Sequence, residues 1–223
     1  MGTAFAGANL GLLLGPPLSG FLDQHVGPMA PFQVGIALVV LDALGRAFLL
    51  SDGEHVPEAP IPWGRLFRNR VVMVFAGAMA LGSAVWTLLE AALPLNLAQR
   101  FGLGSRDIGL AFGAMALAHT LSSPFMGRLS DRIGRARVLR IGLAASVVLM
   151  PLPALLPSPW TVGLAMMALG FNASFLLSPC SPAVADQVER MDSQSFASGF
   201  SILNIAYSVG MALGPLLSGP IID

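Results

Sequence analysis

One acidic residue lies deep within a long apolar stretch of the chain. Glu90 sits in the segment 86–94, which reads WTLLEAALP, and its neighbours are almost all hydrophobic. An ionisable side chain in such surroundings marks a binding or proton-transfer site, because an unpaired carboxylate is costly in hydrocarbon. We expect Glu90 to take up and release a proton and to attract a cationic group. The alternative is a hydrated carboxyl near the outer membrane interface.

Four further polar side chains lie in apolar stretches, where they could contact a solute. These are Asn172, Ser174, Asn204 and Tyr207. The alternative for the last two is a hydrogen bond between helices, worth roughly 0.6–2 kcal/mol. His119 lies near Thr120 and two serines, and we interpret it as a helix-contact residue before a proton relay.

Known catalytic and metal-binding patterns are missing from the sequence. It contains no G-x-S-x-G, H-E-x-x-H, C-x-x-C or G-x-x-x-x-G-K-[ST]. We therefore expect no enzyme activity, no cofactor and no metal, and an ion gradient in place of direct ATP use. The single cysteine, Cys180, lies in an apolar run and cannot form an internal disulfide.

The composition places these residues in a membrane. Hydrophobic residues make up 55% of the 223 residues and charged residues only 11%, with a mean hydropathy of +0.74. A soluble domain has about 25% charged residues, so the solvent for most of this chain must be lipid. The net charge of zero offers no field for nucleic acid, which we exclude as a partner.

Seven apolar stretches are long enough to cross a bilayer, which takes roughly 20 residues in a helix. They are 4–22, 32–50, 71–97, 108–126, 141–156, 160–180 and 197–222. Barrel strands would be about 10 residues long with alternating polarity, so we predict helices. Ten of the twelve arginines lie in or beside the loops after the second, fourth and sixth spans. The positive-inside rule therefore places these loops and the N-terminus in the cytoplasm.

An internal repeat relates the first span to the last. The segments 11–20 and 210–219 share the pattern G-x-x-x-G-P-x-L-S-G at an offset of 199 residues. Its defining positions, which we expect to pack helices together, are Gly11, Gly15, Pro16, Gly20, Gly210, Gly214, Pro215 and Gly219. Spans one and seven run in the same direction, which predicts parallel halves of six helices. The chain would then cover helices five to eleven of twelve; the alternative is chance recurrence of small-residue packing patterns.

The loop 127–137, GRLSDRIGRAR, resembles the G-x-x-x-D-R-x-G-R-x-R loop of the major facilitator superfamily. In that family the loop follows helix eight, the number that the repeat gives to the fourth span. The resemblance implies a cytoplasmic latch that breaks as the two halves rock, with Asp131 near the start of helix eleven and Arg135 paired with Asp186. The expected latch residues are Gly127, Asp131, Arg132, Gly134, Arg135 and Asp186. The alternative is that the arginines only mark the cytoplasmic side of the membrane. That alternative would not explain Gly127, Asp131 and Gly134 at these spacings.

The resemblance also implies a fold and a function. The segment 88–94 is similar to helix seven of vesicular amine transporters and related drug exporters, whose further acids in helices ten and eleven are replaced here. We expect an all-α bundle with about seven membrane helices, incomplete at both ends. Residues 1–50 would end the N-terminal half, 51–70 would form the cytoplasmic loop between halves, and 71–223 would form a C-terminal half lacking its last helix.

The expected function is proton-coupled export of small drug-like or amine solutes, in the cell membrane, by alternating access. Its partners would be the solute, protons, the lipid bilayer and the missing helices of a full-length chain. One alternative is a truncated fragment that does not transport. The other is a seven-helix receptor, which the cytoplasmic N-terminus and the repeat disfavour.

Overall fold

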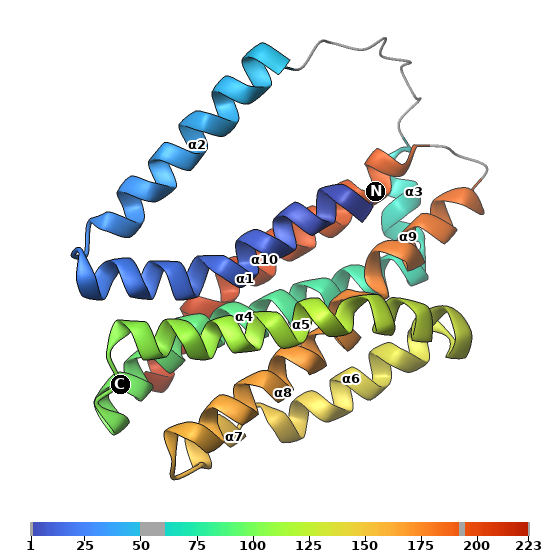
Figure 1. Ribbon diagram of the computed structural model, residues 1–223. Coiled ribbons are helices and arrows are strands. Elements are labelled where there is room, and N and C mark those ends of the chain that lie inside the picture. The colour runs from blue at the N-terminus through green and yellow to red at the C-terminus, as the bar shows by residue number, and fades with distance from the viewer. Residues whose placement is uncertain (1, 50–60, 192–194, 223) are drawn as a thin grey trace.

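The computed structural model describes residues 2–49, 61–191 and 195–222, and these form helices joined by short connectors without any strand. The helices are α1 (Gly2–His25), α2 (Ala30–Leu49), α3 (Trp63–Arg68), α4 (Arg70–Phe101), α5 (Ser105–Ile133), α6 (Arg135–Leu149), α7 (Leu152–Leu155), α8 (Pro159–Leu177), α9 (Cys180–Glu189) and α10 (Phe196–Ile222). The long helices run roughly side by side, and α2 stands apart from the rest (Figure 1).

Within the described part of the chain, six helical segments are long and apolar enough to cross a membrane. They match the second to seventh predicted spans and confirm an all-α membrane architecture. The first predicted span falls within α1, which is helical but is not among the six. No side chain before residue 11 is described.

Prolines divide two of the predicted spans. The stretch predicted as 141–156 is α6 and the short α7, separated at Met150 and Pro151. The sixth span breaks in the same way at Ser178 and Pro179, and continues as α9. A proline lacks the N–H that would bond one turn back, and its ring displaces that carbonyl, so the helix turns or ends there.

Helix α4 pairs with α10 through glycines of the second copy of the repeat. A Cβ at Gly210 would collide with the Ser83 hydroxyl and the Ala80 carbonyl, and one at Gly214 would collide with the Thr87 hydroxyl. The Ser83 hydroxyl also donates to the Tyr207 carbonyl at 3.0 Å. Small residues allow two backbones to approach this closely, which is how helices pack in lipid.

The first copy of the repeat packs α1 on α5, but with different residues. A Cβ at Gly20 would collide with the Ser105 carbonyl, and Gly113 of α5 lies directly against the Pro17 ring. Gly11 and Gly15, by contrast, have no neighbour within 4 Å of an added Cβ. Corresponding positions in the two copies therefore differ in what they contact. The surroundings of Gly219 lie outside what the structure describes.

Two clusters of buried side chains hold α4 to its neighbours. One joins the first half of α4 to α3, α9 and α10, around Val72, Val184 and Leu203. The other joins the second half of α4 to α5 and α8, around Leu97 and Met166. Helix α4 is therefore the central element of residues 61–222, and it carries Glu90.

Candidate functional site

Glu90 lies about two thirds of the way along α4, where its side chain is exposed. At 1.5 Å per residue it is about 30 Å from Arg70 and about 16 Å from Phe101. The Trp86 indole N–H, one turn earlier, donates to its Oε1 at 2.7 Å. This charge-assisted bond fixes one carboxyl oxygen and leaves the other free for a proton or a ligand.

Two more polar rings lie around this carboxyl. His119 of α5 packs against the Trp86 indole, with ring centroids 5.6 Å apart at an angle of 61°. Its Nδ1 is buried and has no hydrogen-bond partner within the described residues. The partly exposed phenol of Tyr207 on α10 lies within electrostatic range of Glu90. Helices α4, α5 and α10 thus bring the Glu90 carboxyl, the His119 imidazole and the Tyr207 phenol into one region.

The other predicted solute contacts divide into two groups. Asn172 and Ser174 are buried in α8 and bond to neighbouring helices. The Asn172 amide donates to the Ser146 hydroxyl at 2.7 Å, and the Ser122 hydroxyl donates to Ser174 at 2.9 Å. Asn204 instead is exposed, one turn before Tyr207 on α10. Asn172 and Ser174 thus bond to neighbouring helices, whereas Asn204 is exposed; their role as solute contacts stays a prediction.

The loop between α5 and α6 forms an ion-pair cluster. The Arg135 Nη2 lies 2.9 Å from Asp186 Oδ2 and 3.5 Å from Asp131 Oδ1, so one guanidinium links α5, α6 and α9. Gly134 connects the two helices with a φ of +98°, a conformation that L side chains rarely adopt. Arg132 is exposed. An added Cβ at Gly127 would meet no atom within 4 Å.

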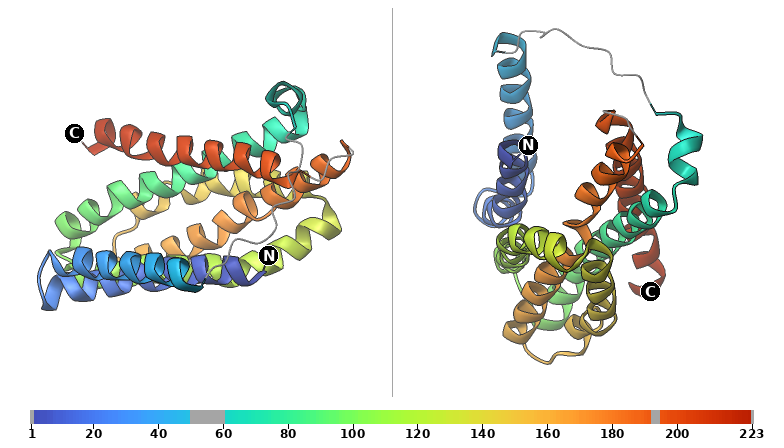
Figure 2. Two further views of the ribbon diagram at one scale, coloured as in Figure 1. Left: turned by 90° about the horizontal axis from the view of Figure 1, so that it is seen from above. Right: turned by 90° about the vertical axis from the view of Figure 1, so that its right-hand side faces the viewer.

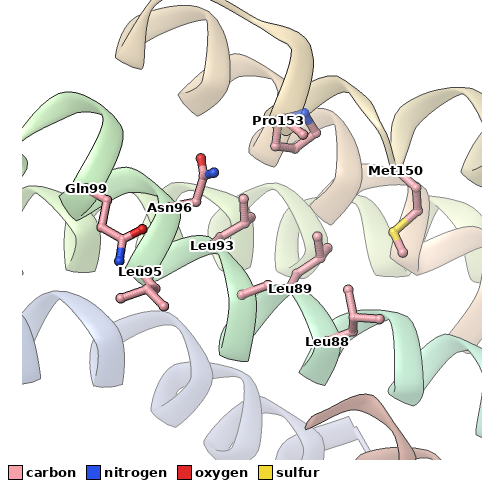
Figure 3. A pocket seen from close by; sticks show the side chains of 10 residues that line it. Leu88, Leu89, Leu93, Leu95, Asn96, Gln99, Met150 and Pro153 are labelled. Atoms are coloured by element: carbon pink, nitrogen blue, oxygen red, sulfur yellow. The ribbon is translucent and has the colours of Figure 1, made fainter. Parts of the chain in front are cut away.

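A cavity of about 300 Å³ lies between α4 and the α6–α7 break (Figure 3). Its wall includes Leu88, Leu89, Leu93, Met150 and Pro153, with two amide side chains at one end. Leu88 lies about 160° around α4 from Glu90 at 100° per residue. This cavity is therefore separate from the Glu90 region, which opens on another side of the helix.

Two features of the site escaped the sequence analysis. Trp86 and Glu90, which are hydrogen-bonded, have the i, i+4 spacing of neighbours on a helix surface. This spacing is visible in the sequence and predicts their contact. The sequence predicts a loop over residues 51–70, whereas Trp63–Arg68 form α3, in which apolar residues and arginines recur at helical spacing. Its six residues are too few to give a clear periodic pattern.

Known proteins resemble this chain along almost its whole length. It is 26% identical to the synaptic vesicular amine transporter of Bos taurus over 226 residues, covering 99% of this chain and 43% of that protein. The chromaffin granule amine transporter of Homo sapiens is 27% identical, covering 100% and 43%. The MFS-type transporter SLC18B1 of Homo sapiens is 29% identical, covering 95% and 49%. The chain thus spans about half the length of the curated relatives it matches.

A family model covers the part of the chain that holds the site. The model of the Major Facilitator Superfamily matches residues 75–223, which is more than half of the chain and includes Glu90, the α5–α6 loop and α10. The helical architecture agrees with that match. The chain therefore belongs to the Major Facilitator Superfamily, a class of multi-pass membrane proteins.

Proposed function

We propose that the protein to which this chain belongs is a secondary transporter that exchanges protons for small organic cations, and exports them by alternating access. The observation that carries the proposal is the Glu90 carboxyl, the one acidic residue of the long span α4, accessible and held by Trp86. A proton and a cationic amine compete for the same carboxylate. Because only one of them can be bound at a time, such a site can exchange one for the other across the membrane. The amine transporters among the relatives are named for solutes of this charge.

The surroundings of Glu90 suit a cation with an apolar body. Trp86 places an aromatic ring beside the carboxylate, with its N–H edge toward Oε1, and Tyr207 adds a hydroxyl and a second ring within electrostatic range. A cation beside such rings gains roughly 0.5–2 kcal/mol, depending on how far it is desolvated. Asn204 remains a candidate hydrogen-bond partner one turn along α10.

The ion-pair cluster gives the proposal its conformational element. Asp186, Arg135 and Asp131 connect three helices at one end of the bundle, so their contacts must change if these helices separate. The Arg135 side chain is only 21% exposed, so separating it from both acids would leave a partly buried charge without a partner. Opening such a latch therefore requires that the guanidinium gain water or a new partner. Its role in transport is part of the proposal.

The proposed orientation puts this end of the bundle in the cytoplasm. Helix α3, the α5–α6 junction and the end of α9 lie at the same end (Figure 1), and they carry or adjoin most of the arginines. The positive-inside rule supports a cytoplasmic location for that end and for the N-terminus. The cell membrane remains the proposed location, while the names of two relatives refer to vesicles and granules.

The test uses proteoliposomes with an acidic lumen and a fluorescent cationic amine outside. We expect the transporter to accumulate the dye, Glu90→Gln to abolish accumulation, and Asp107→Asn to stay within about twofold of the unmodified protein. Asp107 is the matched control because it is an exposed carboxylate in the first turn of α5. Dye accumulation by Glu90→Gln at the unmodified rate would refute the proposal.

The alternative that this 223-residue chain does not transport alone requires a second measurement. Equilibrium binding of the same dye needs the Glu90 region but no conformational cycle. A lost charge-assisted contact is worth about 1.5–3 kcal/mol, so Glu90→Gln should weaken binding about tenfold or more. Binding with no accumulation identifies an inactive fragment, whereas equal binding by both proteins contradicts the assigned role of Glu90.

A further inference from the structure

Helix α3 lies across one end of the bundle. Its axis runs across the axes of the long helices in Figure 1, and it is seen end-on in the left view of Figure 2. Only Asn69 separates it from the start of α4. If the long helices cross a membrane, α3 lies at the level of one membrane surface and parallel to it.

The three sides of α3 differ in chemistry. Leu66 is 1% exposed and belongs to the buried cluster with α4, α9 and α10. Trp63 and Phe67 are 49% and 54% exposed, and their rings stack with centroids 6.0 Å apart. At 100° per residue these two lie within about 40° of each other, while Arg65 and Arg68 lie on the remaining side. The helix therefore presents an aromatic side and a basic side.

Contacts at both ends hold α3 in this orientation. The Ile61 N–H donates to the Ser198 hydroxyl at 3.2 Å before the helix begins. After it ends, Asn69 Nδ2 donates to Gln187 Oε1 at 3.4 Å, and Asn69 Oδ1 accepts from the backbone N–H of Val71 at 3.0 Å. The middle of the aromatic side lies about 80° around α3 from the buried Leu66, and the basic side lies about 130° from it. Trp63 and Phe67 therefore flank the buried side and stay half-exposed in a fixed orientation.

We propose that α3 is a membrane-surface anchor that binds anionic phospholipid headgroups. Trp63 and Phe67 have the amphipathic or apolar character of side chains that insert at the boundary of headgroups and acyl chains. The segment 61–70 contains three arginines and no acidic residue, so its charge is complementary to an anionic surface. Arg65 and Arg68 bind phosphate groups, and the aromatic pair fixes the depth. This anchor does not depend on the proposed transport function.

The experiment compares two brominated lipids, which quench tryptophan fluorescence on contact. Proteoliposomes contain phosphatidylcholine and phosphatidylglycerol in one fixed ratio, and only the identity of the brominated lipid changes. The difference between the unmodified chain and Trp63→Phe isolates the Trp63 signal from the other two tryptophans of the chain. We expect brominated phosphatidylglycerol to quench Trp63 more strongly than brominated phosphatidylcholine at equal mole fraction.

Replacing the arginines tests the cause of that preference. Each basic residue at an anionic surface enriches the lipid about fivefold, so Arg65→Gln with Arg68→Gln should remove the excess quenching. Arg106→Gln is the control, because it is an exposed arginine at the other end of the bundle. Equal quenching by the two lipids, no quenching of Trp63 by either, or a preference that survives the double replacement would each overturn the proposal. The second result would place α3 against protein or water.

Discussion

Gly214→Ala and Gly15→Ala change equivalent positions of the repeat. We expect the first to destabilise the chain and the second to stabilise it slightly. Both glycines precede a proline inside a helix, so the restriction that proline places on the preceding residue is common to both changes. An added Cβ at Gly15 meets nothing within 4 Å. At Gly214 it meets α4, including the backbone of Ala84 and Leu88. The comparison therefore isolates the effect of helix contact.

The magnitude follows from the distances. An added Cβ at Gly214 would lie 2.7 Å from the Leu88 nitrogen, and ordinary contact begins at 3.4 Å, so α10 must retreat by about 0.7 Å. Overpacking of this kind costs about 1–3 kcal/mol. Replacing a helix-interior glycine by alanine returns about 0.5–1 kcal/mol. Because both variants receive this gain, it cancels in their difference, and we expect Gly214→Ala to be less stable than Gly15→Ala by about 1–3 kcal/mol.

The assay is thermal unfolding of the purified chain in detergent, followed by the fraction that remains monodisperse. For a chain of this length, 1 kcal/mol corresponds to about 2–4 °C in midpoint. The Gly214→Ala midpoint should lie below that of Gly15→Ala by at least that amount. Equal midpoints, or a lower one for Gly15→Ala, would refute the reasoning that α10 packs on α4 at its glycines.

Three further predictions concern the α5–α6 loop and α8. Gly134→Ala should destabilise the chain by about 1–3 kcal/mol because its φ is +98°, whereas Gly127→Ala should not; equal unfolding midpoints would contradict this. A double-mutant cycle of Arg135→Gln and Asp186→Asn should give a coupling of about 1–3 kcal/mol, because the Arg135 side chain is only 21% exposed, and a coupling near zero would contradict the pair. Asn172→Ala should lower the free energy of unfolding by about 0.6–2 kcal/mol and leave amine binding unchanged. Weaker amine binding would instead place the amide in the site.

The sequence was sufficient for the architecture because lipid constrains it strongly. Long apolar stretches must form helices, and six of them are found in the described residues. The family was also predictable, because the loop 127–137 has each defining position filled and the family model confirms it. The breaks at Pro151 and Pro179 were not predicted, since proline in a membrane helix can be accommodated or can end it.

The side chains that face each helix neighbour were harder to predict. Helix α8 is largely apolar on all sides, so its sequence does not indicate which side is buried, nor that Asn172 bonds to Ser146 and Ser174 to Ser122. The two copies of the repeat have the same pattern but different contacts, because Gly15 faces open space and Gly214 faces α4. Such differences depend on which helix lies opposite, which is a property of the assembled bundle.

Counting the protons released when an organic cation binds tests whether both ligands compete for the Glu90 carboxyl. The chain in weakly buffered detergent solution, at a pH where the unmodified protein binds both ligands, is titrated with the amine while a pH dye records release. Binding should displace protons from the unmodified chain, and Glu90→Gln should release none. Undiminished proton release from Glu90→Gln would contradict this competition.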